Sequence, residues 1–230
     1  GAGYINGLRS RLFLYDGGTV TPVSDEDSSV RLLTLSPDGG RLWFAGNTFH
    51  GKDPFFEHLY ELNTKTLKTA DISVGSTDQY YGVYPLPGGK DVILASVCKE
   101  HGVNENACVF VREHGKYRTT YDGGKYDFNS SVCTDILAER AMPSEPMVRG
   151  NDVFLIDTQG DSSGLVSLDP ENGAVHAVTK KPGCVSEAVL YGDGFAAVAL
   201  RGNGGCEIYS VSADGREKRL TDLNTAVCRE

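Results

Sequence analysis

Short apolar segments recur along the chain, and each is followed by a turn rich in glycine, aspartate or asparagine and then by a more polar segment. The apolar segments are Leu12–Tyr15, Leu59–Leu62, Val109–Arg112, Leu165–Leu168 and Ile208–Val211. Their turn residues accept the positive φ that tight hairpins require. We therefore predict a β-hairpin at each of these positions.

A second pattern precedes each of the last four hairpins: an apolar segment, a glycine turn and another apolar segment. These pairs occupy residues 32–44, 83–94, 146–156 and 188–199. Their weak alternation is typical of strands covered on both faces, whereas the outer hairpins regain polar residues such as Lys65 and Arg118. Successive hairpins begin 47, 50, 56 and 43 residues apart, which is about the period of four-stranded propeller blades.

The two patterns together predict an all-β protein, a β-propeller fragment of about four to five four-stranded antiparallel blades. Residues 1–24 would form the outer hairpin of a preceding blade, and residues 226–230 would begin a further strand. Between them we expect successive blades at roughly 25–75, 76–125, 126–180 and 181–225. The one helical expectation is a turn or two within residues 134–141, before Pro143.

Charge and hydropathy exclude several partners. The net charge is −9 and no cluster of lysine and arginine appears, so nucleic acid is not an expected partner. No apolar run is long enough to cross a bilayer, and no pattern of a signal peptide precedes the first hairpin. We expect no membrane association and a cytoplasmic protein.

Neither the cysteines nor the acidic run predicts a metal or cofactor site. Six cysteines without a C-x-x-C pair are too sparse for a disulfide scaffold, although Cys98 and Cys108 flank a loop and could pair. Cys133, Cys184 and Cys228 fall at similar places in three repeats, and buried thiols are the ordinary interpretation against a metal site. The run Ser24–Ser28 predicts a solvated turn rather than a cation site.

One motif imitates a catalytic centre. Gly160-Asp161-Ser162-Ser163-Gly164 fits G-x-S-x-G, the nucleophile elbow, which requires a strand before the serine and a helix after it. Here a strand and a hairpin turn follow, so we predict a solvated loop and no nucleophile.

The other titratable candidates form no short motif with ligand or catalytic spacing. His50, His58 and His101 lie in or near long connections, His114 lies in a hairpin turn and His176 lies on an outer strand. For the alternative of a glycosidase or lyase, the candidate carboxylates are Asp135, Glu145 and Glu187, whose spacing fits only loosely. We therefore assign no catalytic, cofactor-binding or metal-binding residue.

Two connections, 46–57 and 99–107, are longer than ordinary hairpin loops, and such loops on a rigid scaffold often carry function. The first contains Phe49, Phe55 and Phe56. Packing of these rings across their own blade is the default expectation, and contact with another domain or a partner is the alternative.

Three segments carry a resemblance to known propellers. The turn Ser36-Pro37-Asp38-Gly39-Gly40-Arg41 resembles that of TolB-like and WD40-like repeats in general. Gly3–Asp16 looks like the mid-propeller segment of acylaminoacyl-peptidase-like members of the prolyl oligopeptidase family, and Arg219–Asn224 looks like the last outer strand of those propellers. At the level of the blade pattern, the resemblance covers essentially the whole chain.

The resemblance implies a function without assigning a catalytic residue. In that family the Ser, Asp and His triad lies on an α/β-hydrolase domain, which would be the partner of this segment in the parent chain, and the propeller restricts entry to short peptides. The chain would then be a non-catalytic portion of a serine peptidase that caps and gates the hydrolase domain. A TolB-like or WD40-like protein-interaction propeller is the alternative.

An incomplete ring has a physical consequence. A propeller protects its strand edges by closing, and an open one exposes strand edges and apolar blade faces. We therefore expect the isolated chain to self-associate through exposed blade edges or to form an open arc.

Overall fold

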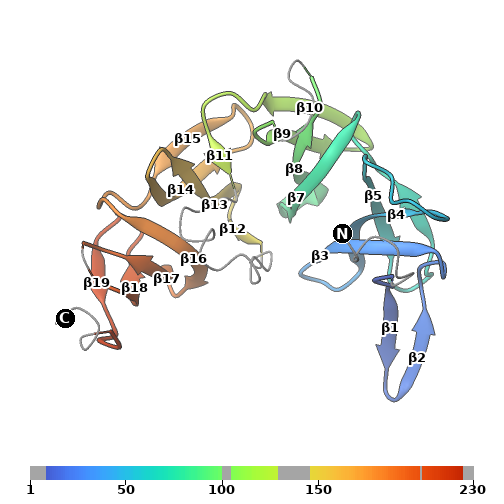
Figure 1. The fold of residues 1–230 in the computed structure, drawn as a ribbon, viewed down its shortest axis with the longest axis horizontal. Coiled ribbons are helices and arrows are strands. Elements are labelled where there is room, and N and C mark those ends of the chain that lie inside the picture. Colours follow the sequence, from blue (N-terminus) through green and yellow to red (C-terminus); the bar gives the residue numbers. More distant parts are fainter. Residues whose placement is uncertain (1–8, 100–104, 129–145, 203, 225–230) are drawn as a thin grey trace. The chain divides into compact units, whose positions relative to one another are not determined.

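A computed structural model describes residues 9–99, 105–128, 146–202 and 204–224, which are coloured in Figure 1. The described elements are strands and one short 3-10 turn, η2 (Pro87–Gly89), so the predicted all-β class is confirmed. The chain forms two compact units, residues 1–83 with 93–105 and residues 84–92 with 106–230. The predicted helical turn at 134–141 and the start of a strand at 226–230 lie outside the described residues.

The strands form one hairpin and a series of antiparallel four-stranded arrangements. The hairpin is β1 (Phe13–Asp16) with β2 (Thr19–Pro22). The first blade is β3 (Ser28–Leu35), β4 (Arg41–Thr48), β5 (His58–Asn63) and β6 (Thr69–Asp71), in that order. The second blade is β7 (Thr77–Pro85), β8 (Asp91–Val97), β9 (Cys108–Glu113) and β10 (Lys116–Tyr121).

The third and fourth blades follow the same order of strands. The third has an inner position shared by β11 (Asp127–Phe128) and β12 (Met147–Arg149), then β13 (Asp152–Gln159), β14 (Ser162–Asp169) and β15 (Ala174–Ala177). The fourth is β16 (Cys184–Tyr191), β17 (Gly194–Leu200), β18 (Cys206–Val211) and β19 (Glu217–Arg219). A single parallel bridge, Ser163 to Cys184, joins the two blades.

In the first, second and fourth blades the second strand is the most buried strand. In β4, Trp43 and Ala45 are fully buried, and in β8 the run Val92–Ala95 is fully buried. The expectation that the first strands are covered on both faces is wrong for two of them. In β3, Leu33 and Leu35 are exposed, and in β16, Val189 and Tyr191 are exposed.

The same serine–aspartate turn closes two hairpins at different places in the blade. In the β3–β4 turn, the Ser36 hydroxyl donates to Asp38 Oδ1 at 2.6 Å and accepts the Arg41 N–H at 2.8 Å. In the β18–β19 turn, Ser212 makes the equivalent bonds with Asp214 and Arg216. These bonds lower the pKa of Asp214 to about 2, chiefly through the Ser212 hydroxyl and the Arg216 side chain.

A hydroxyl clasp ends the outer strand in four of the five hairpins. In each clasp, an apolar residue that follows the outer strand donates its N–H to the carbonyl of one residue of the third strand. The next residue is a serine or threonine, and its hydroxyl accepts the N–H of that same third-strand residue. The clasps join Leu12 to Val23 and Ser24, Leu59 to Ile72 and Ser73, Leu165 to Val178 and Thr179, and Ile208 to Leu220 and Thr221, with distances of 2.8–3.1 Å. The pair Leu220-Thr221 belongs to the segment whose resemblance to a last outer strand is noted above.

The second blade departs from this clasp. A bulge between Thr119 and Tyr121 shifts the register of β10 against β9. Tyr121 then packs its ring against Tyr126 and Phe128, with ring centroids 5.7 and 5.5 Å apart. An aromatic cluster therefore replaces the clasp at this strand end.

Within the unit of residues 84–92 and 106–230, outer hairpins dock on the preceding blade through a glycine. A Cβ on Gly173, in the β14–β15 turn, would lie 2.1 Å from the Thr120 carbonyl oxygen of the second blade. A Cβ on Gly215, in the β18–β19 turn, would lie 2.2 Å from the Val178 carbonyl oxygen of the third blade. The absence of a side chain at these two turns is what allows the blades to approach.

Candidate functional site

The G-x-S-x-G motif lies at the turn between the second and third strands of the third blade. β13 ends at Gln159 and β14 begins at Ser162, so only Gly160 and Asp161 lie between the strands. Ser162, the serine at the nucleophile position of the motif, is partly exposed and donates to Asp161 Oδ1 at 3.1 Å, whereas Ser163 is buried and donates to the Val185 carbonyl at 2.8 Å. The predicted solvated loop is wrong, because residues 162–164 are strand, and strand β14 follows the serine where a nucleophile elbow has a helix.

The structure gathers a serine, a histidine and an aspartate in the first blade, a cluster that the sequence did not predict. His58 Nδ1 lies 2.9 Å from Asp71 Oδ2 and 3.3 Å from the Ser73 hydroxyl, which itself donates to Asp71 Oδ1 at 2.6 Å. In a catalytic triad the acid and the serine contact opposite nitrogens of the imidazole, so that the ring can relay a proton. Here both partners use the same nitrogen, and the serine proton is directed to the carboxylate.

The environment of Asp71 stabilises its ionised form. Burial acts to raise the pKa of Asp71, but the Ser73 hydroxyl, the Ser73 N–H and His58 together lower it below the usual value. Ser73 is also the hydroxyl of the clasp that receives the Leu59 N–H. The cluster therefore anchors the end of an outer strand, and its residues hold structural hydrogen bonds rather than a nucleophile.

A buried aspartate in the third blade has a similar structural role. Asp157 Oδ1 accepts the Asp127 N–H at 2.9 Å and a Gln159 amide hydrogen at 3.3 Å. Burial raises the pKa of Asp157, and these two hydrogen bonds offset the rise only in part. The carboxylate holds the two-residue strand β11 against β13, beside the aromatic cluster of Tyr121, Tyr126 and Phe128.

The remaining histidines and carboxylates of the sequence analysis do not converge. His50 lies 3.4 Å from Asp27, in the exposed turn that the acidic run forms before β3, and His114 and His176 are exposed. Glu187 is an exposed residue of β16, while His101, Asp135 and Glu145 lie outside the described residues. Of the three candidate carboxylates for a glycosidase or lyase, the structure therefore places only Glu187, on the exposed side of β16.

The cysteines that the structure describes form no disulfide with one another. Cys98 and Cys108, which flank a long connection, are not bridged, and neither are Cys184 and Cys206. Cys133 and Cys228 lie outside the described residues. Within the described ranges, no group of three or more histidine, cysteine, aspartate or glutamate side chains could hold a metal ion.

A hollow of about 260 Å³ lies on the outer hairpin of the second blade. It is lined by Val111, Glu113, His114, Lys116, Tyr117 and Arg118. Arg118 is committed to Glu171 of the third blade, donating to its carboxylate at 2.8 Å and to its backbone carbonyl at 2.6 Å. Lys90 completes this clamp with an ion pair to Glu171 at 2.8 Å.

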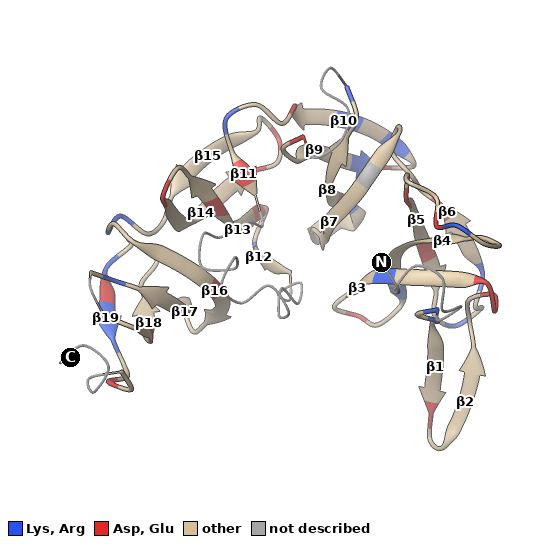
Figure 2. Ribbon diagram, viewed as in Figure 1, with Lys and Arg blue, Asp and Glu red and all other residues tan. Residues whose placement is uncertain are grey.

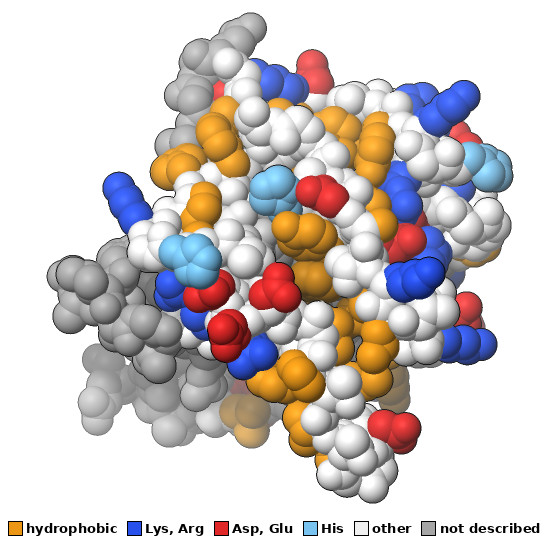
Figure 3. Space-filling model, turned by 90° about the vertical axis from the view of Figure 1, so that its right-hand side faces the viewer, with side chains coloured by type: hydrophobic (Ala, Val, Ile, Leu, Met, Phe, Trp, Pro, Cys, Tyr) orange, Lys and Arg blue, Asp and Glu red, His pale blue; other side chains and the backbone are white. Residues whose placement is uncertain are grey.

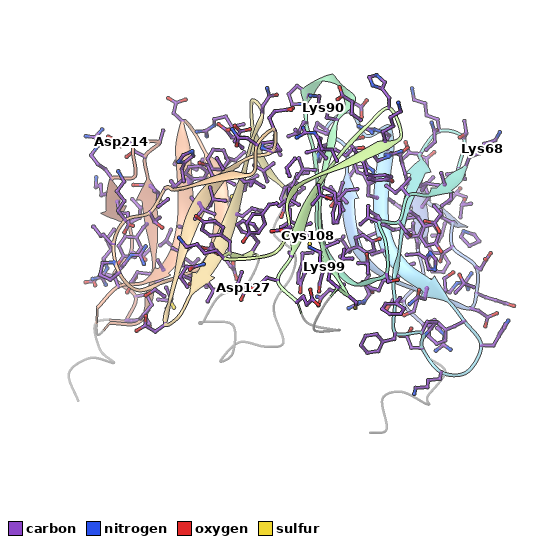
Figure 4. All side chains as sticks on the ribbon, turned by 90° about the horizontal axis from the view of Figure 1, so that it is seen from above. Lys68, Lys90, Lys99, Cys108, Asp127 and Asp214 are labelled. Carbon is purple, nitrogen blue, oxygen red and sulfur yellow. The ribbon has the colours of Figure 1, made fainter. Side chains whose placement is uncertain are left out.

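Figure 4 shows four labelled side chains that lie at the two ends of one unit. In the unit of residues 84–92 and 106–230, Lys90 and Asp214 lie at the end where the hairpin turns gather, and Cys108 and Asp127 lie at the opposite end (Figure 4). Lys and Arg are interspersed with Asp and Glu along the ribbon, without a continuous basic stripe over the residues drawn in colour (Figure 2).

The connection between β4 and β5 exposes aromatic rings. Phe55 and Phe56 are 62% and 45% exposed, and their rings meet edge to face with centroids 5.7 Å apart. The expectation that they pack across their own blade is therefore wrong. Phe49 differs from them, because the Arg9 guanidinium covers its ring at 4.1 Å.

No helix among the described residues is long and apolar enough to cross a membrane. A comparison with protein-family models finds no match, and neither does a search of curated proteins. Similarity appears only at the level of the fold.

Several solved structures share that fold. TolB from Acinetobacter baumannii superposes with a TM-score of 0.61 at 16% identity, over 90% of this chain and 47% of that one. The acylaminoacyl peptidase of Pyrococcus horikoshii gives 0.56 at 13% identity, over 89% and 28%, and a puromycin hydrolase gives 0.54 at 14%, over 94% and 42%. This chain spans less than half the length of each of these three proteins, and the likeness shows that its strands form a β-propeller fold.

Proposed function

We propose that the chain is the non-catalytic propeller portion of a prolyl oligopeptidase-like serine peptidase. In this role it would cap a hydrolase domain outside the 230 residues and gate the access of peptides to it. The observation that carries the proposal is the commitment of the candidate groups to the blades. Ser162 of the G-x-S-x-G motif begins strand β14 and its hydroxyl donates to Asp161 Oδ1. One nitrogen of His58 serves both Asp71 and Ser73.

The structural likeness to an acylaminoacyl peptidase and a puromycin hydrolase supports this proposal, because both are hydrolases much longer than this chain. The segment Gly3–Asp16 and the outer strand at Arg219–Asn224 resemble the same family. The segment Arg219–Asn224 contains the clasp of Leu220 and Thr221, which holds the last outer strand against Ile208.

A second function is favoured by a separate observation. The exposed pair Phe55 and Phe56 would suit a protein-interaction module, and the chain also resembles TolB structures. In that case the propeller would bind other proteins and no hydrolase domain would accompany it.

The coding sequence on either side of residues 1–230 distinguishes the two functions. The peptidase proposal expects a downstream hydrolase domain with G-x-S-x-G between a strand and a helix, followed by the aspartate and histidine of a triad. A stop codon directly after this segment, or further blades alone, would instead favour the interaction module.

A further inference from the structure

The outer hairpin of the third blade turns through Asn172 and Gly173, and the asparagine is exposed. Asparagine is a thermolabile residue, and a following glycine makes it more so, because no side chain keeps the next backbone nitrogen away from the amide. The nitrogen of Gly173 can attack Cγ of Asn172: an N–Cγ bond forms, the Cγ–Nδ2 bond breaks, and ammonia leaves with the proton of the N–H group. Water then opens the cyclic imide at either carbonyl, and the products are aspartate and isoaspartate.

The fold itself calls for this reactive pair of residues. The side-chain oxygen of Asn172 accepts the Ala174 N–H at 2.8 Å, which is the hydrogen bond of an Asx turn. Gly173 has a φ of 73°, and a Cβ there would lie 2.1 Å from the Thr120 carbonyl oxygen of the second blade. Asparagine therefore suits the turn and glycine suits the docking, and the labile dipeptide follows from both.

Two contacts oppose the reaction while the hairpin is docked. The Gly173 N–H donates to the Asp169 carbonyl at 2.8 Å, which holds the proton and keeps the nitrogen from turning toward the asparagine. The Thr120 carbonyl blocks movement of the same glycine from the other blade. The Ala174 N–H acts in the opposite direction, since a donor on Oδ1 stabilises the negative charge that develops there during the attack. The nitrogen is the nucleophile, so its release sets the rate.

A clamp on Glu171 holds the hairpin down beside the dipeptide. Lys90 and Arg118 each contact the Glu171 carboxylate at 2.8 Å, and Arg118 also donates to the Glu171 backbone carbonyl at 2.6 Å. Acidic and basic side chains lie near one another on the face drawn in Figure 3, and isolated surface pairs of this kind contribute little to stability. The clamp differs from such pairs because two cations hold one residue across two blades.

We propose that Asn172 is a site of spontaneous deamidation and that docking of the β14–β15 hairpin on the second blade controls its rate. Local opening of the hairpin, which takes less free energy than global unfolding, frees the Gly173 nitrogen and permits the reaction. Isoaspartate carries the main chain through the former side chain and adds a methylene group to the backbone, so Gly173 no longer fits against Thr120. The modification is therefore a one-way release of the hairpin.

Two other turns of the chain provide internal references. Asn63, in the β5–β6 turn, is also exposed and its side chain also accepts N–H groups of the turn, but the next residue is Thr64, whose branched side chain hinders the attack. The β18–β19 turn docks through Gly215, but the residue before it is Asp214, whose ionised carboxylate is a poor electrophile. We expect both turns to stay unmodified under conditions that convert Asn172.

The rate of deamidation in the folded and the unfolded chain tests the proposal. The purified chain is incubated at neutral pH in buffer and in urea, and peptides are analysed by mass spectrometry. An isoaspartate methyltransferase labels the isoaspartate product. We expect Asn172 to convert at least about tenfold more slowly in buffer than in urea, because the attack waits for the hairpin to open. Equal rates in the two conditions, or no conversion beyond that of Asn63 in either, would overturn the proposal.

The pair Arg118→Gln and Lys116→Gln separates the clamp from the chemistry of the dipeptide. Both variants remove one positive charge from β10, far from Asn172 in the sequence, but Arg118 contacts Glu171 whereas Lys116 is an exposed residue beside the hollow. We expect Arg118→Gln to speed the conversion in buffer by about threefold to tenfold and to leave the rate in urea unchanged. Equal rates for the two variants in buffer would contradict control by docking.

Hydrogen exchange of the two products tests the release of the hairpin. Asn172→Asp reproduces the aspartate product without lengthening the main chain, so amides of β15 should exchange as slowly as in the wild type. The isoaspartate form, separated from aged protein, should exchange faster in the same strand. Equal exchange in both forms would show that the hairpin stays docked after modification and would overturn the release.

Discussion

Gly173 and Gly215 have a packing role between blades that Gly150 lacks. Gly173 and Gly215 have φ of 73° and 83°, and each lies against a carbonyl of the preceding blade. Gly150 has a similar φ of 61°, but open space surrounds the position where its Cβ would be. Backbone conformation alone therefore explains glycine at 150, whereas close approach adds a second reason at 173 and 215.

The substitution Gly173→Ala should destabilise the protein more than Gly150→Ala. Left-handed backbone costs about 1–2 kcal/mol at either position, and the overlap with the Thr120 carbonyl adds about 1–3 kcal/mol at 173. Urea unfolding of both variants, followed by circular dichroism, measures the difference. Equal losses of unfolding free energy would contradict the docking role of Gly173.

Glu207 holds the segment that follows β19. The pKa of the Glu207 carboxyl is lowered to about 2. The hydrogen bond from the Thr221 hydroxyl lowers this pKa most, burial opposes the fall, and the N–H groups of Leu223 and Asn224 lower the pKa further. An acid whose pKa is lower in the folded state stabilises the fold above its unfolded pKa and loses that contribution as the pH falls. The window for Glu207 thus runs from its ordinary value of 4.5 down to about 2.

The stability difference between wild type and Glu207→Gln should therefore depend on pH. We expect the wild type to be the more stable at pH 7, and the gap to narrow as the pH falls from about 4.5 to about 2. Urea midpoints of both proteins across this range provide the measurement, with Asp214→Asn as a comparison because the pKa of Asp214 is also about 2. A stability difference between wild type and Glu207→Gln that stays constant as the pH falls would contradict the stabilising role of the ionised Glu207 carboxylate.

At the scale of elements, the clasp is the feature that makes an outer strand return to its blade. In the third blade the clasp is buried, with Leu165 at 0% and Thr179 at 8% exposure. Thr179→Val keeps the shape of the side chain but leaves the Leu165 N–H without its acceptor at 2.9 Å. An unsatisfied buried donor costs about 1–3 kcal/mol, so Thr179→Val should lower the unfolding free energy by this amount.

The matched control for this substitution is Thr179→Ser, which keeps the hydroxyl and removes only a methyl group. We expect Thr179→Ser to retain most of the stability that Thr179→Val loses in a denaturant titration. A larger loss for serine than for valine would mean that packing, not the hydrogen bond, holds the strand end.

The strands were predictable from the sequence because their signal is local. Apolar runs bounded by turns such as Asp193-Gly194 mark β16 and β17 without any knowledge of the rest of the chain. The clasp was missed because its residues, such as Val178 and Thr179, look like any polar strand end. The hydrogen bonds that these residues make depend on which third-strand residue lies opposite them, and that pairing exists only in the folded sheet.

The errors in the candidate site have the same origin. The segment Gly160–Gly164 was expected to be a solvated loop because it connects the second and third strands of the blade, but β14 already begins at Ser162 and Ser163 pairs with Cys184. Phe55 and Phe56 were expected to pack on their blade because isolated aromatic residues usually do, yet they are exposed. His58, Asp71 and Ser73 are up to fifteen residues apart in the sequence and meet only because β5 and β6 pair.

At the scale of the whole molecule, the described residues form blades whose polar groups are committed to one another. The clasps, the Arg118–Glu171 clamp and the serine–aspartate turns use the hydroxyls, carboxylates and guanidinium groups that a catalytic centre would need. This commitment is what the proposed role expects, that of a scaffold that controls access to another domain or binds a partner.

The measurement that tests this account most directly is labelling of the purified chain with a fluorophosphonate probe, which reacts only with an activated serine. We expect no labelling of residues 1–230, while a known serine hydrolase in the same reaction is labelled. Labelling of Ser73, Ser162 or Ser163, abolished by substitution of that serine with alanine, would show a catalytic serine within the blades and would contradict the account.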